Sequence, residues 1–262
     1  MAAVNDADLP LPTATTTEAR NLGADVAVLP VGSFEQHGPF LPLTTDTLVA
    51  TALAARIADT YRLLALPPVT ISCSHEHAAW AGTVSISAGT LSAVVGDVAE
   101  SLQRSGVSRL AVVNGHGGNH VLANTVQEAS RDGRRLALFP DLMDWESARE
   151  RAGIESSLTS DMHAGEAEVS VLLHTHPTLL RDGYASSDHT ADDRRHLHTH
   201  GMTAYTDTGV IGHPSLATAA KGEALLAHLV ELFQGHLTAL HEPPVKDTGS
   251  TGDPHGTRDN AS

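Results

Sequence analysis

Short apolar runs alternate with longer segments of helical periodicity along most of the chain, and this alternation limits its possible folds more than any other feature. Four apolar runs are typical of buried strands, at residues 26–31, 63–66, 108–113 and 136–139. Helical patterns follow at residues 47–58, 91–103, 119–129, 164–174 and 216–241. Such alternation favours a parallel sheet with helices on both faces, the α/β class. In these sheets, ligands bind beyond the carboxyl ends of the strands.

The length and composition suit one domain. The chain has 262 residues, of which 41% are hydrophobic, enough to bury one sizeable core. We expect the folded domain to span residues 21–241. The polar residues 1–20 predict a flexible N-terminal arm. Residues 242–262 contain almost no apolar side chains and predict a disordered C-terminal tail.

Charge and composition argue against several classes of partner. The chain carries 16 Lys and Arg against 31 Asp and Glu, a net charge of −15. No nucleic-acid or anionic-membrane partner is expected, because phosphate binding depends on clustered cations. The sequence shows neither a transmembrane segment nor the pattern of a signal peptide. A single cysteine, Cys73, excludes an intrachain disulfide and favours a cytoplasmic location.

Three polar clusters follow apolar runs, and the first lies within residues 32–46. In an extended chain Glu35 and His37 point to the same side, because side chains alternate along a strand. Together with Asp46 they offer the carboxylates and imidazole that suit Zn²⁺ or Mn²⁺. The alternative is a polar loop in which Asp46 caps the following helix.

The second cluster, residues 114–119, places glycines on both sides of His116. Glycine lets the backbone turn tightly and lets a ligand approach closely. The spacing fits neither a dinucleotide fingerprint nor a phosphate-binding loop. The alternative is a helix-starting turn in which the histidine has no special role.

The third cluster, residues 161–168, opens a predicted helix that begins at Ala164. On such a helix Glu168 shares an apolar stripe, where an unpaired charge is costly unless a cation or donors satisfy it. Glu166 lies on a mixed face and is the poorer ligand candidate. His163 precedes the helix and is free for proton transfer. An ordinary charged helix is the alternative.

The three clusters together supply five candidate ligands, which are Glu35, His37, Asp46, His116 and Glu168. They suffice for two metal ions bridged by Asp46, an arrangement that activates water and polarises a carbonyl group. A serine hydrolase is less favoured, because no GxSxG motif occurs. A Cys73 nucleophile with His75 or His77 rests only on adjacency in sequence.

Several motifs share an order and spacing with one family. They are EQHGPFLP and TD (35–46), HEHAAWAGT (75–83), NGHGGN (114–119), HAGEAE (163–168) and GVIGHPSLATAAKG (209–222). Through them, about residues 25–240 resemble the creatininase family of creatinine amidohydrolases. The resemblance implies a single three-layer α/β/α domain with a mostly parallel sheet. It also implies a homohexamer and a binuclear metal site.

By position, the resemblance assigns the ligands. It implies one ion held by Glu35, Asp46 and His116, and a second held by His37, Asp46 and Glu168. We expect up to two ions per chain, Zn²⁺ with Mn²⁺ or Fe²⁺ as candidates for the weaker site. His163 matches the residue thought to contact substrate and pass the proton. We expect His163 and Glu35 to carry the catalysis.

Two glycines depart from creatininase proper. Gly117 and Gly118 stand where that enzyme has an aromatic residue and a metal-binding carboxylate. The first ion is therefore expected to be bound more weakly, creatinine to be a poor substrate and the pocket to be roomier. The glycine version resembles branches that include a formamidopyrimidine deformylase and a peptidase that trims the mycofactocin precursor peptide.

Six residues are expected to contact the substrate, and they are Ser74, His77, Trp80, Gly117, Gly118 and Trp145. For His75 and His77 a supporting role beside the metal ligands is the other interpretation. The histidine-rich segment 189–200 is expected to be a solvated loop.

The main hypothesis from the sequence is a metal-dependent amidohydrolase that cleaves a non-peptide or cyclic amide C–N bond. The close alternative is a peptidase that trims a small modified precursor peptide of the mycofactocin type. A non-catalytic, metal-stabilised binding protein is a third class. The expected partner is therefore a small-molecule amide or a short peptide.

Overall fold

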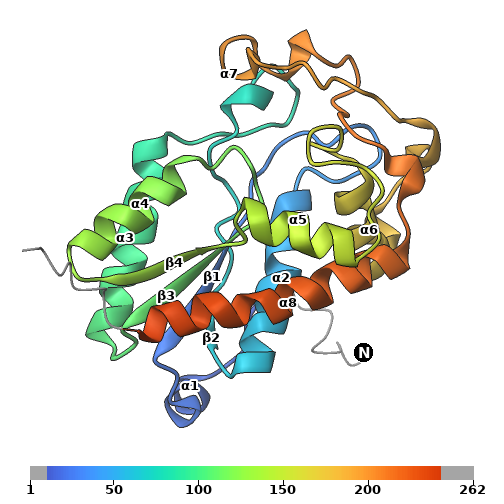
Figure 1. Cartoon of the computed structure of the whole chain (residues 1–262). Coiled ribbons are helices and arrows are strands. Elements are labelled where there is room, and N and C mark those ends of the chain that lie inside the picture. The colour runs from blue at the N-terminus through green and yellow to red at the C-terminus, as the bar shows by residue number, and fades with distance from the viewer. Residues whose placement is uncertain (1–10, 243–262) are drawn as a thin grey trace, which may run out of the picture.

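The computed structural model describes residues 11–242, and a sheet of four parallel strands lies at its centre (Figure 1). The strands are β1 (Val26–Val31), β2 (Leu64–Ala65), β3 (Arg109–Asn114) and β4 (Arg135–Phe139), in the order β2-β1-β3-β4. In the register of the central pair, Val28 lies opposite Ala111. The predicted α/β class with a parallel sheet is confirmed.

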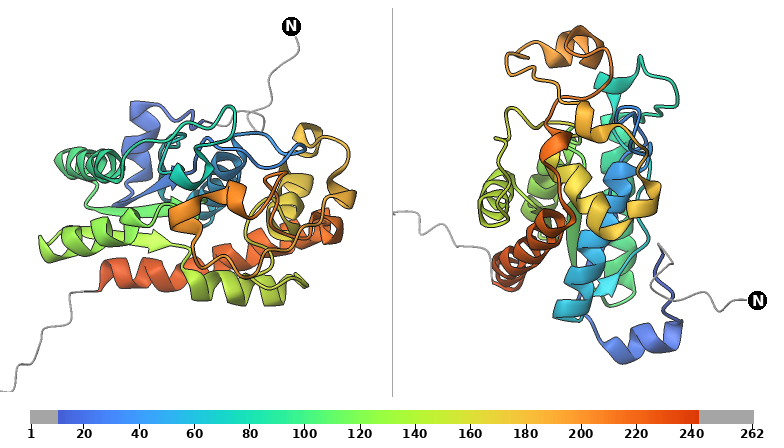
Figure 2. Two further views of the ribbon diagram at one scale, coloured as in Figure 1. Left: turned by 90° about the horizontal axis from the view of Figure 1, so that it is seen from above. Right: turned by 90° about the vertical axis from the view of Figure 1, so that its right-hand side faces the viewer.

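Helices connect and flank these strands. The α-helices are α1 (Thr16–Leu22), α2 (Thr45–Tyr61), α3 (Ala88–Arg104), α4 (Val121–Arg131), α5 (Leu142–Arg151), α6 (Glu166–Thr175), α7 (Leu197–His200) and α8 (Ala219–His241). Short 3₁₀ turns are η2 (His75–His77), η3 (Pro177–Leu179), η4 (Tyr184–Ser186), η5 (Met202–Ala204) and η6 (Pro214–Leu216). Helix α1 lies at the periphery, at the end of the molecule opposite α7 (Figures 1 and 2).

Each face of the sheet is covered by its own set of helices. Alternate residues of β1 point to opposite faces, so Val26 and Val28 enter one core while Ala27 and Leu29 enter the other. The first core also contains side chains of α2, α5, α6 and α8, and the second contains side chains of α3 and α4. Burial on both faces explains why the strand sequences are continuously apolar.

The sheet topology creates one natural crevice. From β1 the chain moves to β2 on one side, and it later returns to β3 on the other side of β1. The connections that leave the carboxyl ends of β1 and β3 therefore diverge, which opens a crevice at this edge of the sheet.

Two local predictions were wrong, and one helix was not predicted. Residues 16–20, predicted to belong to a flexible arm, lie in α1, whose start is closed by a capping box between Thr15 and Glu18. Helix α5 was not predicted, because its pattern of apolar residues is weak. Helix α6 begins at Glu166 rather than Ala164, because Ala164 adopts a left-handed backbone conformation with φ 54°. The predicted tail lies almost wholly outside the described residues.

Among residues 11–242, no helix combines the length and the apolar character that a membrane span requires.

Candidate metal centre

The five predicted ligands come together at the crevice between β1 and β3. Glu35 and His37 lie on the loop after β1, Asp46 lies in the first turn of α2, and His116 follows β3. Glu168 lies in the first turn of α6. These elements are far apart in sequence but meet at the carboxyl edge of the sheet, as α/β topology requires.

The carboxylate of Asp46 lies between two histidine rings. Its Oδ1 atom is 3.0 Å from Nε2 of His37, and its Oδ2 atom is 3.1 Å from Nδ1 of His116. The hydroxyl of Ser33 donates a hydrogen bond of 2.6 Å to Oδ2. A Cβ atom at Gly115 would lie 2.4 Å from the carbonyl oxygen of Asp46, so only glycine lets the loop after β3 pass this close to α2.

Two groups of possible ligand atoms share Asp46. Glu35, Asp46 and His116 form one group, and His37, Asp46 and Glu168 form the other; within each, the ligand atoms lie within 4.8 Å of one another. The Nδ1 atom of His116 is 3.2 Å from Oε1 of Glu35, and Nε2 of His37 is 3.9 Å from Oε2 of Glu168. A third group, whose ligand atoms also lie within 4.8 Å of one another, combines Glu35 and His37 with His163.

In His37 and His116, the ring nitrogen on the side opposite Asp46 is bound to a backbone carbonyl. Nδ1 of His37 is 3.1 Å from the carbonyl oxygen of Glu35, and Nε2 of His116 is 2.8 Å from that of Cys73. A carbonyl only accepts, so each of these nitrogens carries a proton. The other nitrogen of each ring faces the shared carboxylates. In metal-binding histidines, the nitrogen that does not bind the metal commonly donates its proton to a backbone carbonyl, as seen here.

The electrostatics of the two rings are those of a cation site. Burial lowers the pKa of His37, but the carboxylates of Asp46, Glu168 and Glu35 outweigh it and raise the pKa to about 10. The pKa of His116 is also raised well above its ordinary value, because Glu35 and Asp46 overcome the effect of burial. The carboxylates of Glu35, Asp46 and Glu168 therefore favour a positive charge at the position where an ion would sit.

The pKa values of the carboxyl groups also indicate a cation site. Burial and the nearby Asp46 raise the pKa of Glu35, and burial raises that of Glu168 to about 7. Burial also opposes ionisation of Asp46, but His37 and His116 hold the pKa of its carboxyl well below the usual range. Within the described residues, neither carboxylate oxygen of Glu35 has a hydrogen-bond partner, although both are buried. Buried oxygen and nitrogen ligand atoms whose charge is not neutralised by other groups fit one or two divalent cations.

A second pair of buried histidines borders this centre. His163 is held by antiparallel pairing with Ile211, and its Nδ1 atom lies 3.9 Å from Oε1 of Glu35. Nε2 of His77 lies 3.3 Å from the same oxygen atom. Burial and neighbouring histidine charges lower the pKa of both rings, that of His77 to about 3. Both are therefore neutral imidazoles near pH 7.

The start of α6 is organised by Asp161, the first residue of the third polar cluster, in a role that the sequence did not predict. Asp161 accepts hydrogen bonds from the backbone amides of Glu166 (2.5 Å) and Ala167 (3.1 Å) and so caps the helix. The carboxylate of Glu166 is bound by Lys221 at 2.6 Å. Glu166 is therefore engaged away from the centre, in agreement with its weak prediction as a ligand. Glu168 accepts from the Ala164 amide at 2.6 Å.

A cavity of about 650 Å³ adjoins the centre and includes His116, His163 and Glu168 in its lining. Its other walls come from the end of β4, from α4 and α5, and from the segment before α6. They are mainly apolar, with side chains that include Leu138, Leu142, Trp145, Leu158 and Met162. Cavities of this size and polarity are typical of sites for small organic ligands.

The predicted substrate-contacting residues separate into two sets. Gly117 and Trp145 line the cavity. His77 instead lies beside Glu35, and a Cβ atom at Gly118 would meet Nε2 of His116 at 2.4 Å. Ser74 and Trp80 are absent from the described lining of this cavity, and Ser74 Oγ and Trp80 Nε1 are buried without a hydrogen-bond partner among the described residues.

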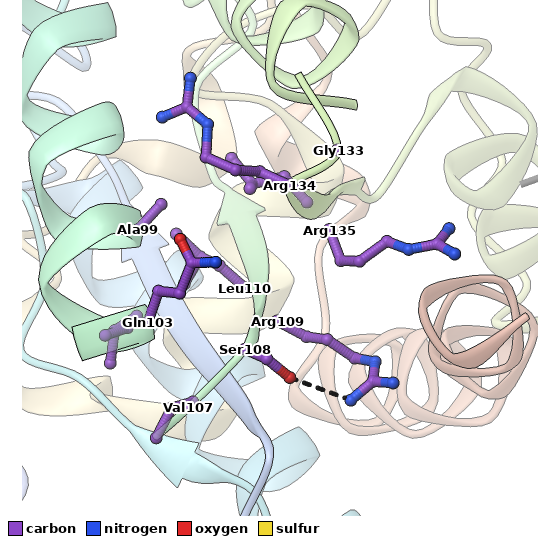
Figure 3. A pocket seen from close by; sticks show the side chains of 11 residues that line it. Ala99, Gln103, Val107, Ser108, Arg109, Leu110, Gly133, Arg134 and Arg135 are labelled. Carbon is purple, nitrogen blue, oxygen red and sulfur yellow. Dashed lines mark hydrogen bonds between the residues drawn. The ribbon is translucent and has the colours of Figure 1, made fainter. Parts of the chain in front are cut away.

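A smaller cavity of about 140 Å³ lies at the opposite edge of the sheet, where β3 and β4 begin (Figure 3). Arg109, Arg134 and Arg135 contribute to its lining, but Arg134 extends away from the other two. Three guanidinium groups that do not converge form no single anion site, and among residues 11–242 no carboxylate or histidine lines the cavity. This cavity is not a candidate active site.

Sequence reasoning missed residues that support the ligands. Gln36 contacts His77 and His163, and Ser33 holds Asp46. Asp161 also accepts a hydrogen bond from the buried Arg149 of α5 at 3.1 Å. Gln36 lies between Glu35 and His37 within the motif, but strand alternation predicts that its side chain points away from them.

Comparison with known proteins agrees with this geometry. A family model described as creatinine amidohydrolase matches residues 12–236. The chain is 35% identical over 227 residues to the mycofactocin precursor peptide peptidase of Mycolicibacterium smegmatis, which covers 82% of this chain and 86% of that protein. It is 31% identical over 181 residues to creatinine amidohydrolase of Pseudomonas putida, covering 62% and 69% of the two chains.

Solved structures show the same fold. The crystal structure named as that of a putative creatinine amidohydrolase from Bacteroides fragilis superposes with a TM-score of 0.72 at 24% identity, over 88% of this chain and 96% of that one. A manganese form of creatininase superposes with a TM-score of 0.69 at 22% identity, over 88% and 98%. The family model and the sequence relatives show that this chain belongs to the creatininase family and is an amidohydrolase that acts on C–N bonds.

Proposed function

We propose that the chain is a metal-dependent peptidase that trims a small modified precursor peptide of the mycofactocin type. The observation that carries the proposal is the cavity of about 650 Å³ beside the ligand cluster, with Gly117 in its lining. A small ring such as creatinine would fill only a fraction of this volume. The sequence relatives named as mycofactocin precursor peptide peptidases support the same choice.

The proposed centre would hold two divalent ions, and Asp46 belongs to both groups of possible ligands. Glu35 and His116 would complete the ligand set of one ion, and His37 and Glu168 would complete that of the other. The proposed ions are Zn²⁺, with Mn²⁺ or Fe²⁺ at the weaker site formed with Glu35. When bound, such ions activate water and stabilise negative charge that develops on the substrate carbonyl oxygen.

The protein residues supply proton transfer and binding. Nε2 of His163 is 2.6 Å from the carbonyl oxygen of Gln36, so the neutral ring carries its proton there. Its unprotonated Nδ1 atom faces Glu35 and can accept a proton from the attacking water. The same atom then returns the proton to the leaving nitrogen. Trp145 and its apolar neighbours would hold the peptide side chains.

Hydrolysis of a cyclic or non-peptide amide is the second candidate. The match to creatinine amidohydrolase favours it, and the chemistry at the centre would be the same. We further propose a homohexamer, following the family resemblance. We also propose a cytoplasmic location, which the single buried Cys73 supports because no intrachain disulfide is required.

A substrate panel tests the choice. Metal-loaded protein is incubated with short peptides, formamides, lactams and creatinine, and each product is quantified by mass spectrometry. The proposal predicts the highest kcat/KM for a peptide and poor turnover of creatinine. Efficient creatinine turnover without peptide cleavage would reverse the choice, and absence of all turnover would favour a binding protein. Sedimentation analysis tests the hexamer.

A further inference from the structure

The side-chain amide of Gln36 is held in one orientation by two backbone groups. Its Oε1 atom accepts a hydrogen bond of 2.9 Å from the amide of Gly38. Its Nε2 atom donates one of 3.1 Å to the carbonyl oxygen of Gly209. A backbone amide only donates and a carbonyl only accepts, so the two ends of the Gln36 amide are assigned without ambiguity.

This orientation determines which nitrogen of His77 carries the proton. The second hydrogen of the Gln36 amide points at Nδ1 of His77, and the two nitrogens are 3.0 Å apart. Because the amide nitrogen only donates, Nδ1 must accept. The neutral ring of His77 therefore carries its proton on Nε2. That N–H group is the one that faces Oε1 of Glu35, at 3.3 Å.

The backbone of the same residue determines the state of His163. The carbonyl oxygen of Gln36 accepts from Nε2 of His163 at 2.6 Å. The rings of His77 and His163 are also in contact, with centroids 4.4 Å apart. Gln36 thus contacts both neutral histidines, one through its side chain and the other through its backbone.

We propose that Gln36 is a positioning residue for the hydrolytic reaction, because its amide keeps a proton on Nε2 of His77 and so turns a donor toward Glu35. In the other tautomer a lone pair of His77 would face the buried carboxylate, whose oxygen atoms have no hydrogen bond among the described residues, although Nδ1 of His116 also lies 3.2 Å from Oε1. Since Glu35 is a proposed metal ligand, this inference rests on the proposed function. It assigns His77 to orienting Glu35 rather than to binding a metal.

The ring tautomers are measured directly in metal-free protein. Nitrogen-15 NMR of labelled histidine rings distinguishes a protonated Nε2 from a protonated Nδ1, and the signals of His77 are identified by their loss in His77→Gln. We expect His77 in the unaltered protein to carry its proton on Nε2. A proton on Nδ1 would overturn the proposal, whatever the variants do.

Two substitutions then separate the tautomer from packing. Gln36→Glu replaces the amide donor by an acceptor, so His77 is expected to move its proton to Nδ1. Gln36→Met keeps a similar volume without a donor, and is expected to weaken Zn²⁺ binding by about 10–100-fold, the usual cost of losing a group that supports a ligand. Gln127→Glu and Gln127→Met, at an exposed position of α4, are the matched controls.

Circular dichroism confirms that each variant is folded before titration. An unchanged His77 tautomer in Gln36→Glu, or unaltered Zn²⁺ affinity in folded Gln36→Met, would contradict a positioning role. The tautomer and the affinity are read without substrate. Failure of the peptidase assignment would leave both results intact, so the two proposals are tested separately.

Discussion

Single atoms distinguish the four buried histidines of the centre. His37, His116 and His163 each direct one ring nitrogen to a backbone carbonyl, whereas His77 meets the side chain of Gln36 instead. The backbone contacts leave the opposite nitrogens of the first three rings toward the carboxylates. At this scale, function depends on which atom of a ring faces the site.

The first prediction concerns the shared carboxylate. Asp46→Asn is expected to lose both ions, because Asp46 belongs to both ligand groups, whereas Glu168→Gln is expected to lose one. Metal content after gel filtration is measured by mass spectrometry. Asp97→Asn, an exposed aspartate of α3, is the control. Full metal content in Asp46→Asn would refute the binuclear assignment.

The second prediction separates proton transfer from metal binding. His163→Ala is expected to keep its metals and its fold and to lower kcat by about 10²–10⁴, the usual effect of removing a positioned acid or base. Steady-state kinetics and metal analysis are measured on the same preparation. Loss of metal would identify His163 as a ligand, as its group with Glu35 and His37 would permit. Normal turnover would require another proton donor.

At the scale of elements, the contact between α6 and α8 holds the helix that carries Glu168. A Cβ atom at Gly222 of α8 would lie 2.0 Å from the carbonyl oxygen of Ser170 of α6. Only glycine permits this approach of two helix backbones. The position of Glu168 therefore depends on a residue that is distant from it in sequence.

The third prediction uses two glycines of the same helix. Gly222→Ala is expected to reduce the free energy of unfolding by about 1–3 kcal/mol, because the added methyl group overpacks the contact. Gly235→Ala is the matched control. A Cβ atom there meets nothing within 4 Å in the described part of the chain, so alanine is expected to stabilise α8 by about 0.5–1 kcal/mol. Urea denaturation measures both. Equal stability of the two variants would contradict the close approach.

At the scale of the whole molecule, the charged centre links stability to pH. In metal-free protein the pKa of His37 is about 10, above its ordinary value of 6.5. A raised histidine pKa contributes stability that is fully present below pH 6.5 and is lost as the pH rises toward 10. Glu168, whose pKa is raised to about 7, acts in the same direction at lower pH, because its contribution is lost between about pH 4.5 and pH 7.

The fourth prediction follows from this linkage. Metal-free protein is expected to become less stable between pH 7 and pH 9.5, whereas Zn²⁺ should reduce the loss by replacing the protons on His37 and His116. Urea denaturation at both pH values, with chelator or with Zn²⁺, measures the difference. His37→Gln in the metal-free form should show a smaller dependence on pH. Rising stability of the metal-free protein over this range would contradict the assignment.

The elements predictable from the sequence were those with strong local patterns. The strand at Val26–Val31 was predicted to the residue, because strands buried on both faces are continuously apolar. Helix α5 was missed because it is partly exposed: Leu142 and Met143 remain 65% and 76% exposed. Its start depends on a capping box between Asp141 and Asp144 rather than on periodicity.

The sequence by itself determined the chemical types and the chain order of the candidate ligands, because strand ends, glycine turns and helix starts are local features. Tertiary structure alone decided that His77 lies beside Glu35 and that Gln36 reaches Gly209. It also placed Asp161 at the start of α6 and opened the cavity beside Trp145. These contacts join segments whose separation in sequence has no periodic signature, and packing of the loops at the carboxyl edge of the sheet brings them together.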